Sequence, residues 1–306
     1  MTVRIAEYLG VNTFQDTKQI LPIKNVKATK PVRQCPFKYG HCDKLTKGNQ
    51  PVCSVRKIDN THWITCEHRL CATVKSQRDI STNSIVRNAP LVDHQKRILQ
   101  RISAEIYGDD VNFSNIGIRR EEPVPVEGGN TYKADFVMVD KNNKAGVNFI
   151  LEMQGGGETT NTGKITSHIE QWCEAKSPSN ELLREPIPSA GTLETNAWRR
   201  QQEQFLVKGN VVTQTGGRIV FAVGSLIFDY IYDRISRSNL RDLKGLGWSL
   251  ALLSIKDEVS QDNLHIDFKI DESRTIYTNY NTFVRTLTDQ GAPRPELFQG
   301  EFVDII

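Results

Sequence analysis

Three oxygen-bearing side chains flank two short apolar segments near the middle of the chain. Asp135 precedes the first segment, residues 136–139, and Glu152 and Gln154 follow the second, residues 147–151. Carboxylate and amide oxygens are ligands that suit Mg²⁺, which can bridge a phosphate and activate a water molecule. The spacing therefore predicts a hydrolytic magnesium site, in which Asp135 and Glu152 hold the metal and Gln154 positions the water.

The two apolar segments are rich in β-branched and aromatic residues, and the polar residues between them have the composition of a turn. We expect an antiparallel hairpin. With the turn centred on residues 142–143, Asp135 lies opposite Ile150, one diagonal step from Glu152. Glu152 and Gln154 share a face because they are two positions apart on a strand. The hairpin should therefore bring the three side chains together.

A helix over residues 93–107 supplies a fourth candidate catalytic residue. Apolar side chains recur at helical spacing from Ile98 to Ile106, and Gly108 follows the last of them. Glu105, near the end of this helix, could reach the metal from the side. The alternative is a glutamate that is simply solvated.

Composition excludes several classes of protein. The 306 residues are 38% hydrophobic and 25% charged, which is enough apolar material for one large core and a smaller module. The first residues contain no apolar signal region, and the longest apolar stretch, residues 219–232, is shorter than a membrane span and contains Asp229. We expect a cytoplasmic protein with no membrane partner.

Positive charge is concentrated in residues 18–57. This segment contains ten Lys or Arg residues and one acidic residue, Asp43, so its net charge is about +9 in a chain whose formal charge is +3. A region of one sign and this strength favours a polyanion such as DNA, bound through phosphate contacts. The alternative is a solvated basic loop.

Five of the six cysteines occur in or just after the basic segment. They are Cys35, Cys42, Cys53, Cys66 and Cys71. Clustered thiols in a reducing cytosol are more often metal ligands than disulfides, and four thiolates around Zn²⁺ or Fe would help a segment with few apolar residues to fold. The spacing lacks the CxxC pairs of a simple zinc ribbon. Unligated buried thiols, or substitution by His41, His62 or His68, remain alternatives.

Five cysteines leave a choice for four ligand positions. Cys71 lies in a mostly apolar run, residues 69–74, where a free thiol packs as a small hydrophobe. We therefore predict a structural metal site formed by the other four cysteines, with replacement of Cys66 by Cys71 left open. Four thiolates close the coordination sphere, so this metal should contribute to folding or DNA docking and not to hydrolysis.

The predicted elements indicate an α/β fold with two regions. Residues 1–84 should form an N-terminal region with the cysteine module, and residues 85–306 a catalytic and DNA-recognition domain with a mixed central sheet flanked by helices. Further elements are predicted as a helix at 163–175 and strands at 218–223 and 248–255. The glycines at 155–157 should let the chain turn sharply after the strand that carries Glu152.

These motifs together resemble a known family. Ala134-Asp135 with Leu151-Glu152-Met153-Gln154 resembles the PD-(D/E)xK nuclease core in a variant where glutamine replaces the usual lysine. The cysteine segments resemble the motif that precedes this core in the NotI and EagI family of type II restriction endonucleases: Cys35-Pro36-Phe37, Cys42-Asp43-Lys44, Cys53-Ser54-Val55 and Cys66-Glu67-His68-Arg69. The resemblance covers roughly residues 30–175.

The resemblance implies a restriction-endonuclease-like core and a type II restriction endonuclease. Such an enzyme acts as a homodimer with catalytic Mg²⁺, cuts both strands of a palindromic, GC-rich site in double-stranded DNA, and works in the prokaryotic cytoplasm beside a cognate DNA methyltransferase for the same site. By the same analogy, Asp135, Glu152 and Gln154 are the active-site residues. The ligands of one structural iron or zinc ion would be Cys35, Cys42, Cys53 and Cys66.

Two other functions are compatible with the same motifs. A monomeric nuclease of the same core could repair or process DNA, and a non-catalytic DNA-binding module is a third class. Because the glutamine amide carries no positive charge, Lys133 or Lys164 is considered as a substitute cation. Residues 198–203, Arg237 and Arg241 are candidates for base readout in the major groove.

Overall fold

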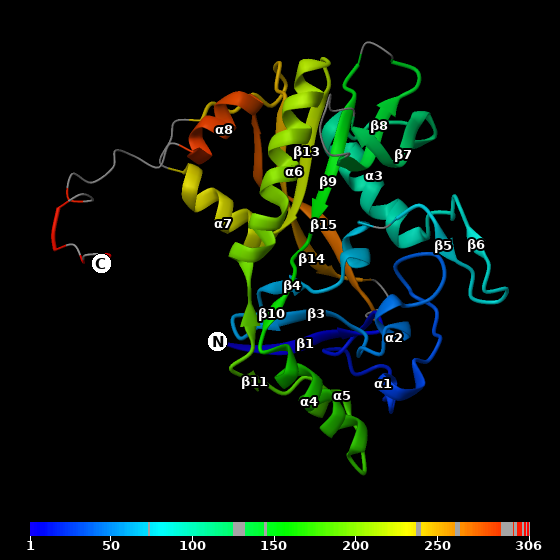
Figure 1. The fold of residues 1–306 in the computed structure, drawn as a ribbon. Helices are drawn as coiled ribbons and strands as arrows, with labels where there is room; N and C mark the ends of the chain where they lie inside the picture. The colour runs from blue at the N-terminus through cyan, green and yellow to red at the C-terminus, as the bar shows by residue number, and fades with distance from the viewer. Residues whose placement is uncertain are drawn as a thin grey trace.

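The computed structural model describes residues 1–72, 74–124, 132–143, 146–236, 240–260 and 264–288, together with 296, 299–301, 303 and 305, with the backbone alone at 203, 204 and 259. Within this part of the chain the fold is mixed α/β, and its centre is a six-stranded sheet (Figure 1). The strands, in spatial order, are β15 (Ile266–Thr278), β14 (Leu250–Val259), β13 (Arg218–Gly224), β9 (Phe149–Gln154), β8 (Tyr132–Asp140) and β7 (Ile116–Val124).

The central sheet combines both strand orientations. β13 runs parallel to β9 and β14, whereas the other neighbouring pairs are antiparallel. The predicted mixed sheet is therefore confirmed. Two of its strands, the edge strands β7 and β15, were not predicted from the sequence.

Helices cover both faces of this sheet. On one face, α3 (Asp93–Tyr107) packs its apolar side against alternate sheet residues such as Val220 and Ala251. The other face is covered by α6 (Glu194–Gln214), α7 (Ser225–Ile235) and α8 (Tyr280–Thr288), which share a hydrophobic cluster with Ile219 and Phe221. This alternation along β13 follows from the two-residue period of a strand. The sheet is thus buried on both sides, as parallel strands require.

The hairpin of β8 and β9 forms as expected, but its register differs from the prediction. Phe136 pairs with Leu151 and Val137 with Ile150. This pairing places Asp135 opposite Glu152, two positions further along β9 than the expected partner, Ile150. The turn is therefore centred one residue later than the asparagine pair, because the pairing of apolar side chains and not the turn composition sets the register.

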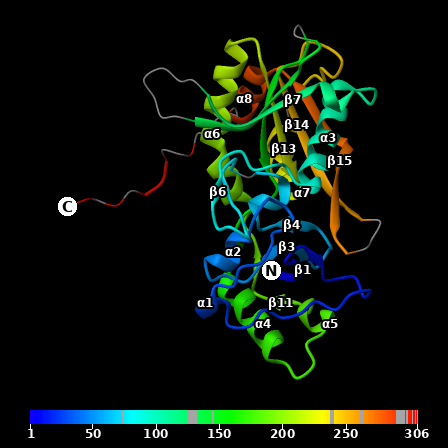
Figure 2. The ribbon, with the colours of Figure 1, turned by 90° about the vertical axis from the view of Figure 1, so that its right-hand side faces the viewer.

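The N-terminal region contains a sheet of its own, ordered β11, β1, β3 and β4, with β2 at the end of β1 (Figures 1 and 2). The strands are β1 (Thr2–Tyr8), β2 (Val11–Asn12), β3 (Val52–Lys57), β4 (His62–Ile64) and β11 (Ile187–Pro188). Ile5, Val55 and Trp63 belong to the same hydrophobic cluster as Phe221 of the central sheet. The region predicted as a separate module thus shares its core with the rest of the chain.

Later parts of the chain also complete this N-terminal sheet. β11 pairs with β1, and α4 (Thr162–Glu174) and α5 (Asn180–Leu183) contribute buried side chains to the same cluster. The predicted boundary at residue 84 therefore separates sequence segments that are interleaved in space. The expectation that a metal must compensate for too few apolar residues overlooked these long-range contacts, which a local composition count does not contain.

Arg69 links β1 of the N-terminal sheet to β15, an edge strand of the central sheet. Arg69 donates to Glu7 Oε2 at 2.8 Å, and both side chains are inaccessible to solvent. The Arg69 guanidinium lies between the rings of Phe37 and Phe268, 4.2 Å from each centroid, and also donates to the carbonyl of Ile266. Charge and stacking together satisfy this buried arginine.

The remaining elements are short. They are α1 (Val26–Thr29), α2 (Asp43–Thr46), η1 (Glu67–Leu70), β5 (Gln77–Arg78), β6 (Ile85–Val86), η2 (Phe113–Asn115), β10 (Thr159–Thr160) and β12 (Gly191–Thr192). Each helix within the described residues is either too short or too polar to cross a bilayer.

Candidate active site and cysteine cluster

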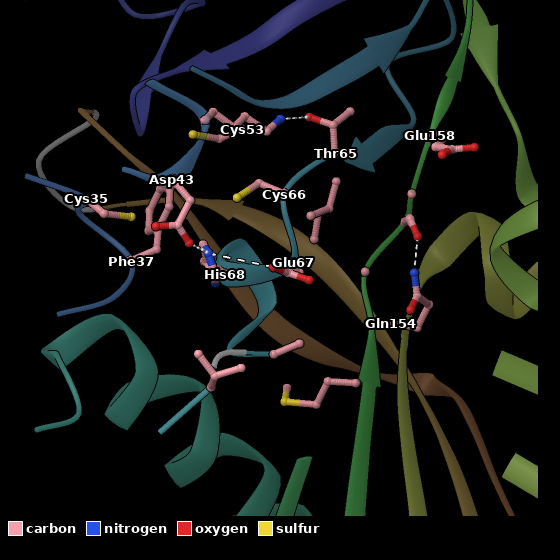
Figure 3. A pocket seen from close by; sticks show the side chains of 18 of the residues that line it. Cys35, Phe37, Asp43, Cys53, Thr65, Cys66, Glu67, His68, Gln154 and Glu158 are labelled. Atoms are coloured by element: carbon pink, nitrogen blue, oxygen red, sulfur yellow. Dashed lines mark hydrogen bonds and ion pairs between the residues drawn. The ribbon is translucent and has the colours of Figure 1, made fainter. Parts of the chain in front are cut away.

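A cavity of about 730 Å³ lies where the two sheets meet. Three of its lining residues, Asp135, Glu152 and Gln154, come from β8 and β9. The opposite wall contains four cysteines, Cys35, Cys42, Cys53 and Cys66. Figure 3 shows the two walls, with the thiols on one side and Gln154 on the other. The two constellations predicted separately from the sequence therefore face one space.

Asp135 and Glu152 form the acidic centre of this cavity. They lie opposite each other in the strand register, and the Met153 N–H donates to Asp135 Oδ2 at 2.9 Å. Burial raises the pKa of Asp135 above its usual range; the Met153 N–H and the charge of Lys208 lower this pKa but do not cancel the effect of burial. Two carboxylates so close favour a shared cation.

Glu152 is almost fully buried, and its two oxygens differ. Oε2 accepts a hydrogen bond from Lys208 Nζ at 2.7 Å, whereas Oε1 is buried without a hydrogen-bond partner. Burial, followed by the charge of Asp135, raises the pKa of Glu152 to about 8, although Lys208 acts in the opposite direction. A buried carboxylate oxygen without a partner is costly. A cation bound beside it would satisfy it.

These donors fit a divalent metal ion. Oε1 of Glu152 is available, Asp135 lies directly across the strand pair, and both line a cavity that is open enough for water. Oxygen ligands and remaining waters are the usual environment of Mg²⁺ in proteins. The protein thus offers two carboxylates, and a substrate or waters would complete the coordination.

Gln154 is held at both ends of its amide. Nε2 donates to the carbonyl of Gly156, and Oε1 accepts from Gln201 Nε2 at 2.7 Å. The side chain shares the face of Glu152, as predicted, and reaches the cavity wall. Its orientation is fixed by neighbours, so it can place a water only from this locked position.

Three glycines after Gln154 have a role that the sequence analysis did not identify. Gly157 N–H donates to the Ile64 carbonyl at 2.9 Å, so β4 lies beside the chain that leaves β9. A Cβ atom on Gly156 would lie 2.2 Å from Ile64 O, and one on Gly155 would lie 2.6 Å from Ile64 Cδ1. Close approach of two backbones, and not only freedom to turn, requires glycine here.

The four predicted cysteine ligands line one cavity wall: Cys53 lies on β3, Cys42 and Cys66 directly precede α2 and η1, and Cys35 lies in a loop. In Figure 3 the sulfur atoms of Cys35, Cys53 and Cys66 point toward a common region. Burial, with smaller contributions from the neighbouring thiols of Cys42 and Cys66, raises the pKa of Cys35 to about 12. Burial likewise raises the pKa of Cys53, with contributions from Cys66 and Cys35. All four thiols thus line one wall of the cavity.

The thiols are not yet at ligand spacing. Among the residues that the structure describes, no group of three or more His, Cys, Asp or Glu side chains is already arranged to hold a metal ion. The donor chemistry fits zinc or iron, but the side chains would have to turn toward one point to bind it. A buried cation would also favour the deprotonated thiolates, which burial alone disfavours.

Cys71 lies apart from this cluster. Its side chain is fully buried among Ile98, Leu99 and Ile102 of α3, and its thiol donates to the carbonyl of Gln95 at 3.6 Å. Cys71 is also absent from the cavity wall that contains the other four thiols. Its surroundings are those of a small hydrophobic residue in a core.

Asp43 and its partners lie next to the cysteine cluster. The carboxylate of Asp43 lies 2.8 Å from His68 Nε2 and pairs with the buried Lys38 at 3.1 Å. The contact with His68 and the charge of Lys38 hold the pKa of Asp43 well below its usual range despite partial burial. The histidines considered as substitute ligands thus differ in their partners: His68 and His41 face Asp43, whereas the ring of His62 makes a tilted contact with the ring of Phe268.

Glu105 is not brought to the cavity. Its carboxylate accepts from Tyr277 at 2.6 Å and from Lys244 at 2.7 Å. Tyr277 belongs to β15, which lies three strands away from β9 in the central sheet. The expected approach of Glu105 to the metal from the side therefore does not occur, because α3 directs this end of the helix toward the opposite edge of the sheet.

Neither of the two lysines considered as substitute cations, Lys133 and Lys164, forms an ion pair with Glu152 in the described part of the chain. Lys133 lies at the cavity wall but is largely exposed and 3.9 Å from Glu121, and Lys164 is exposed on α4. The buried cation beside Glu152 is instead Lys208, in the middle of α6. The only sequence feature that could have identified Lys208 is its place in a partly apolar helical segment. Its partner, Glu152, is 56 residues away in the chain, so no local pattern indicates the pair.

The candidates for base readout are divided. Trp198 is buried in the core, whereas Arg200 and Gln201 line the cavity and Arg200 donates to Glu158 at 2.6 Å. Arg241 is exposed in the segment between α7 and β14. Arg237 and the side chain of Glu203 lie outside the described residues.

The charges around the cavity have a definite pattern. Six acidic residues line it against four Lys or Arg residues, so its interior favours cations. Most of the basic residues of segment 18–57 are exposed, and one of these, Lys47, also lines the cavity. The exposed members are Lys18, Lys24, Lys27, Lys30, Arg33 and Lys47. An acidic interior beside a basic exterior suits a metal ion and a polyanion together.

No protein-family model matches the chain, and no curated protein matches it. The resemblance drawn from the two motifs therefore remains a prediction. The function must be argued from the cavity itself.

Proposed function

We propose that the protein is a Mg²⁺-dependent nuclease, and more specifically a type II restriction endonuclease that cuts both strands of a palindromic DNA site. The observation that carries this proposal is the pair of Asp135 and Glu152 across β8 and β9, with Glu152 Oε1 buried and unpartnered. Two converging carboxylates at a strand end, open to a cavity, are the minimum that phosphodiester hydrolysis with a metal ion requires.

The chain's own residues would divide the work. Asp135 and Glu152 hold the cation, which supplies activation of water and neutralisation of charge on the phosphate. Lys208 keeps Glu152 Oε2 engaged, and the contact from Gln201 fixes Gln154 at the cavity wall. Gln154 orients the attacking water from there. These roles rest on contacts that are present before any substrate binds.

DNA would be bound by the basic surface beside the cavity. Lys44, Lys47, Lys133 and Arg200 line its wall, and further exposed Lys and Arg residues occur in segment 18–57. Phosphate contacts of this kind make affinity fall steeply with salt concentration. The homodimer, the palindromic and GC-rich site, the restriction-endonuclease-like core and the partner methyltransferase come from the family resemblance and belong to the proposal.

The cysteine cluster would hold a structural iron or zinc ion in the same proposal. It lies on the wall that faces Asp135 and Glu152, so it would fix that wall and not take part in hydrolysis. The wall also carries Lys44 and Lys47. Binding of the ion would thus order residues that approach the DNA backbone.

The decisive experiment is digestion of a long, sequenced, unmethylated DNA with purified protein and Mg²⁺, followed by sequencing of the fragment ends. Uniform ends at one palindrome would establish a restriction endonuclease. Asp135→Ala and Glu152→Ala should bind the DNA and fail to cut it. Ragged ends, or cutting restricted to mismatched or single-stranded DNA, would instead favour a repair or processing nuclease. Binding without any cleavage in wild-type protein would contradict the proposal.

A further inference from the structure

Lys208 is the buried cation of the candidate active site. It lies in the middle of α6, its side chain is 1% exposed, and its Nζ lies 2.7 Å from Glu152 Oε2. A lysine is rarely buried to this degree, because its charge must be compensated within the protein. Packing alone does not explain a lysine at this buried helix position, because an apolar side chain could fill the same space without the free-energy cost of burying a charge.

The bond from Lys208 selects which oxygen of Glu152 remains available. Oε2 is engaged by the ammonium group, and Oε1 is left buried and without a hydrogen-bond partner. Without Lys208, the carboxylate could rotate, and both oxygens would be buried without compensation. Lys208 therefore fixes both the charge and the orientation of the group that faces the metal position.

Gln154 cannot provide this charge. Its amide is neutral, and its two ends are engaged by Gly156 and Gln201. Gln201 is also on α6, seven residues before Lys208, which is two helical turns and therefore the same face. Two residues of α6 thus hold the two side chains of β9: Lys208 bonds to Glu152, and Gln201 bonds to Gln154.

The position of α6 is itself fixed next to Lys208. A Cβ atom on Gly209 would lie 2.2 Å from the ring of Tyr280, and the Tyr280 hydroxyl donates to the carbonyl of Leu206. Glycine in a helix interior is destabilising relative to alanine. Here the glycine lets α8 pack directly against α6, and this contact restricts the helix turn that carries Lys208.

We propose that Lys208 is a positioning residue of the metal site, and that the charge on its side chain holds Glu152 in the orientation that receives the cation. This inference rests on the proposed nuclease function for the identity of the site. It adds that the positive charge, which the family motif would place two residues after Glu152, is supplied here by a helix 56 residues away in the chain.

The test is a calorimetric titration of metal-free protein with Mg²⁺ or Mn²⁺ in the absence of DNA. Lys208→Met should weaken cation binding at least tenfold, and Lys208→Arg, which retains the charge, should stay within threefold of wild type. Lys38→Met is the matched control, because Lys38 is equally buried and is also paired with a carboxylate, that of Asp43. The control should lose stability and leave cation binding within threefold.

Thermal unfolding of each variant in chelator shows whether it is folded. If Lys208→Met does not fold, Lys208→Gln replaces it, with the same expected tenfold loss. Unchanged or tighter cation binding in the uncharged variant, or an equal loss in Lys208→Arg, would overturn the inference. If wild-type protein cuts DNA and binds the cation while Lys208→Met binds it equally well, only this inference fails. If wild-type protein neither binds the cation nor cuts DNA, the proposed function fails with it.

Discussion

The carbonyl of Ile64 accepts the backbone N–H of Gly157 at 2.9 Å and so joins the N-terminal sheet to the end of β9. This contact lies three residues beyond Gln154. It brings the cysteine wall of the cavity to the carboxylates of the central sheet. The geometry of the candidate site therefore depends on how closely β4 approaches the glycines after β9.

Replacing Gly156 by alanine should disturb this junction. The new Cβ would lie 2.2 Å from the Ile64 oxygen, so the two backbones must separate. We expect a loss of about 2–3 kcal/mol in the free energy of unfolding, measured in urea, since overpacking costs about 1–3 kcal/mol. Gly163→Ala on α4 is the control, because nothing lies within 4 Å of its Cβ position, and its stability should not fall. Equal stability of the two variants would contradict this account of the junction.

Cation binding should become tighter as pH rises toward 8. Burial and the charge of Asp135 raise the pKa of Glu152 to about 8, so below that pH a proton competes with the metal for the carboxylate. Mn²⁺ affinity in the absence of DNA should therefore increase about tenfold per pH unit between pH 6 and 8 and then level off. Glu152→Gln should show weaker binding and a flatter profile. A profile that stays flat over this range would mean that the pKa of Glu152 is not raised.

The same group affects the stability of the metal-free protein. The folded pKa of Glu152 is above its ordinary value of 4.5, so the folded state binds the proton more tightly than the unfolded state does. Its contribution to stability is complete below pH 4.5 and is lost as pH rises through about 8. Added Mn²⁺ should offset this loss, because it binds only the folded state.

The cysteine cluster should bind one structural metal ion in protein purified without added zinc. Cys53→Ser should remove most of this metal and lower the melting temperature, because one of four ligands is lost. Cys71→Ser is the matched control, since Cys71 is equally buried but lies in the core beside α3. It should destabilise the fold and keep the metal, as measured by elemental analysis. Metal-free wild-type protein would show that the thiols are only packed side chains.

Glu105 should not be required for cleavage. Its carboxylate is bonded to Lys244 and Tyr277, three strands away from β9. Glu105→Gln should retain cleavage within twofold and lose about 1 kcal/mol of stability, the usual effect of weakening a hydrogen bond to a charged group. Asp135→Asn, measured beside it, should lower cleavage at least a hundredfold. A comparable loss of activity in Glu105→Gln would mean that this glutamate reaches the site during turnover.

The sequence alone determined the elements whose residues carry a local pattern. The helix at 93–107 has the predicted bounds, α4 begins and ends one residue earlier than predicted, and the hairpin of β8 and β9 forms between apolar runs. Helical spacing and β-branched composition act within a few turns of chain, so they can be read locally. The carboxylates and the four cysteines were also chosen from residue type and spacing alone.

Only the tertiary structure decided which of these residues meet. In the structure the strand register places Asp135 opposite Glu152 and not opposite Ile150. Glu105 bonds to Tyr277, and Lys208 bonds to Glu152. Strand register and helix packing depend on apolar contacts between segments far apart in the chain, and these contacts have no local signature. The residue types of the candidate metal site can therefore be read from the sequence, whereas the lysine that pairs with Glu152 and the cysteine wall of the cavity can be identified only from the fold.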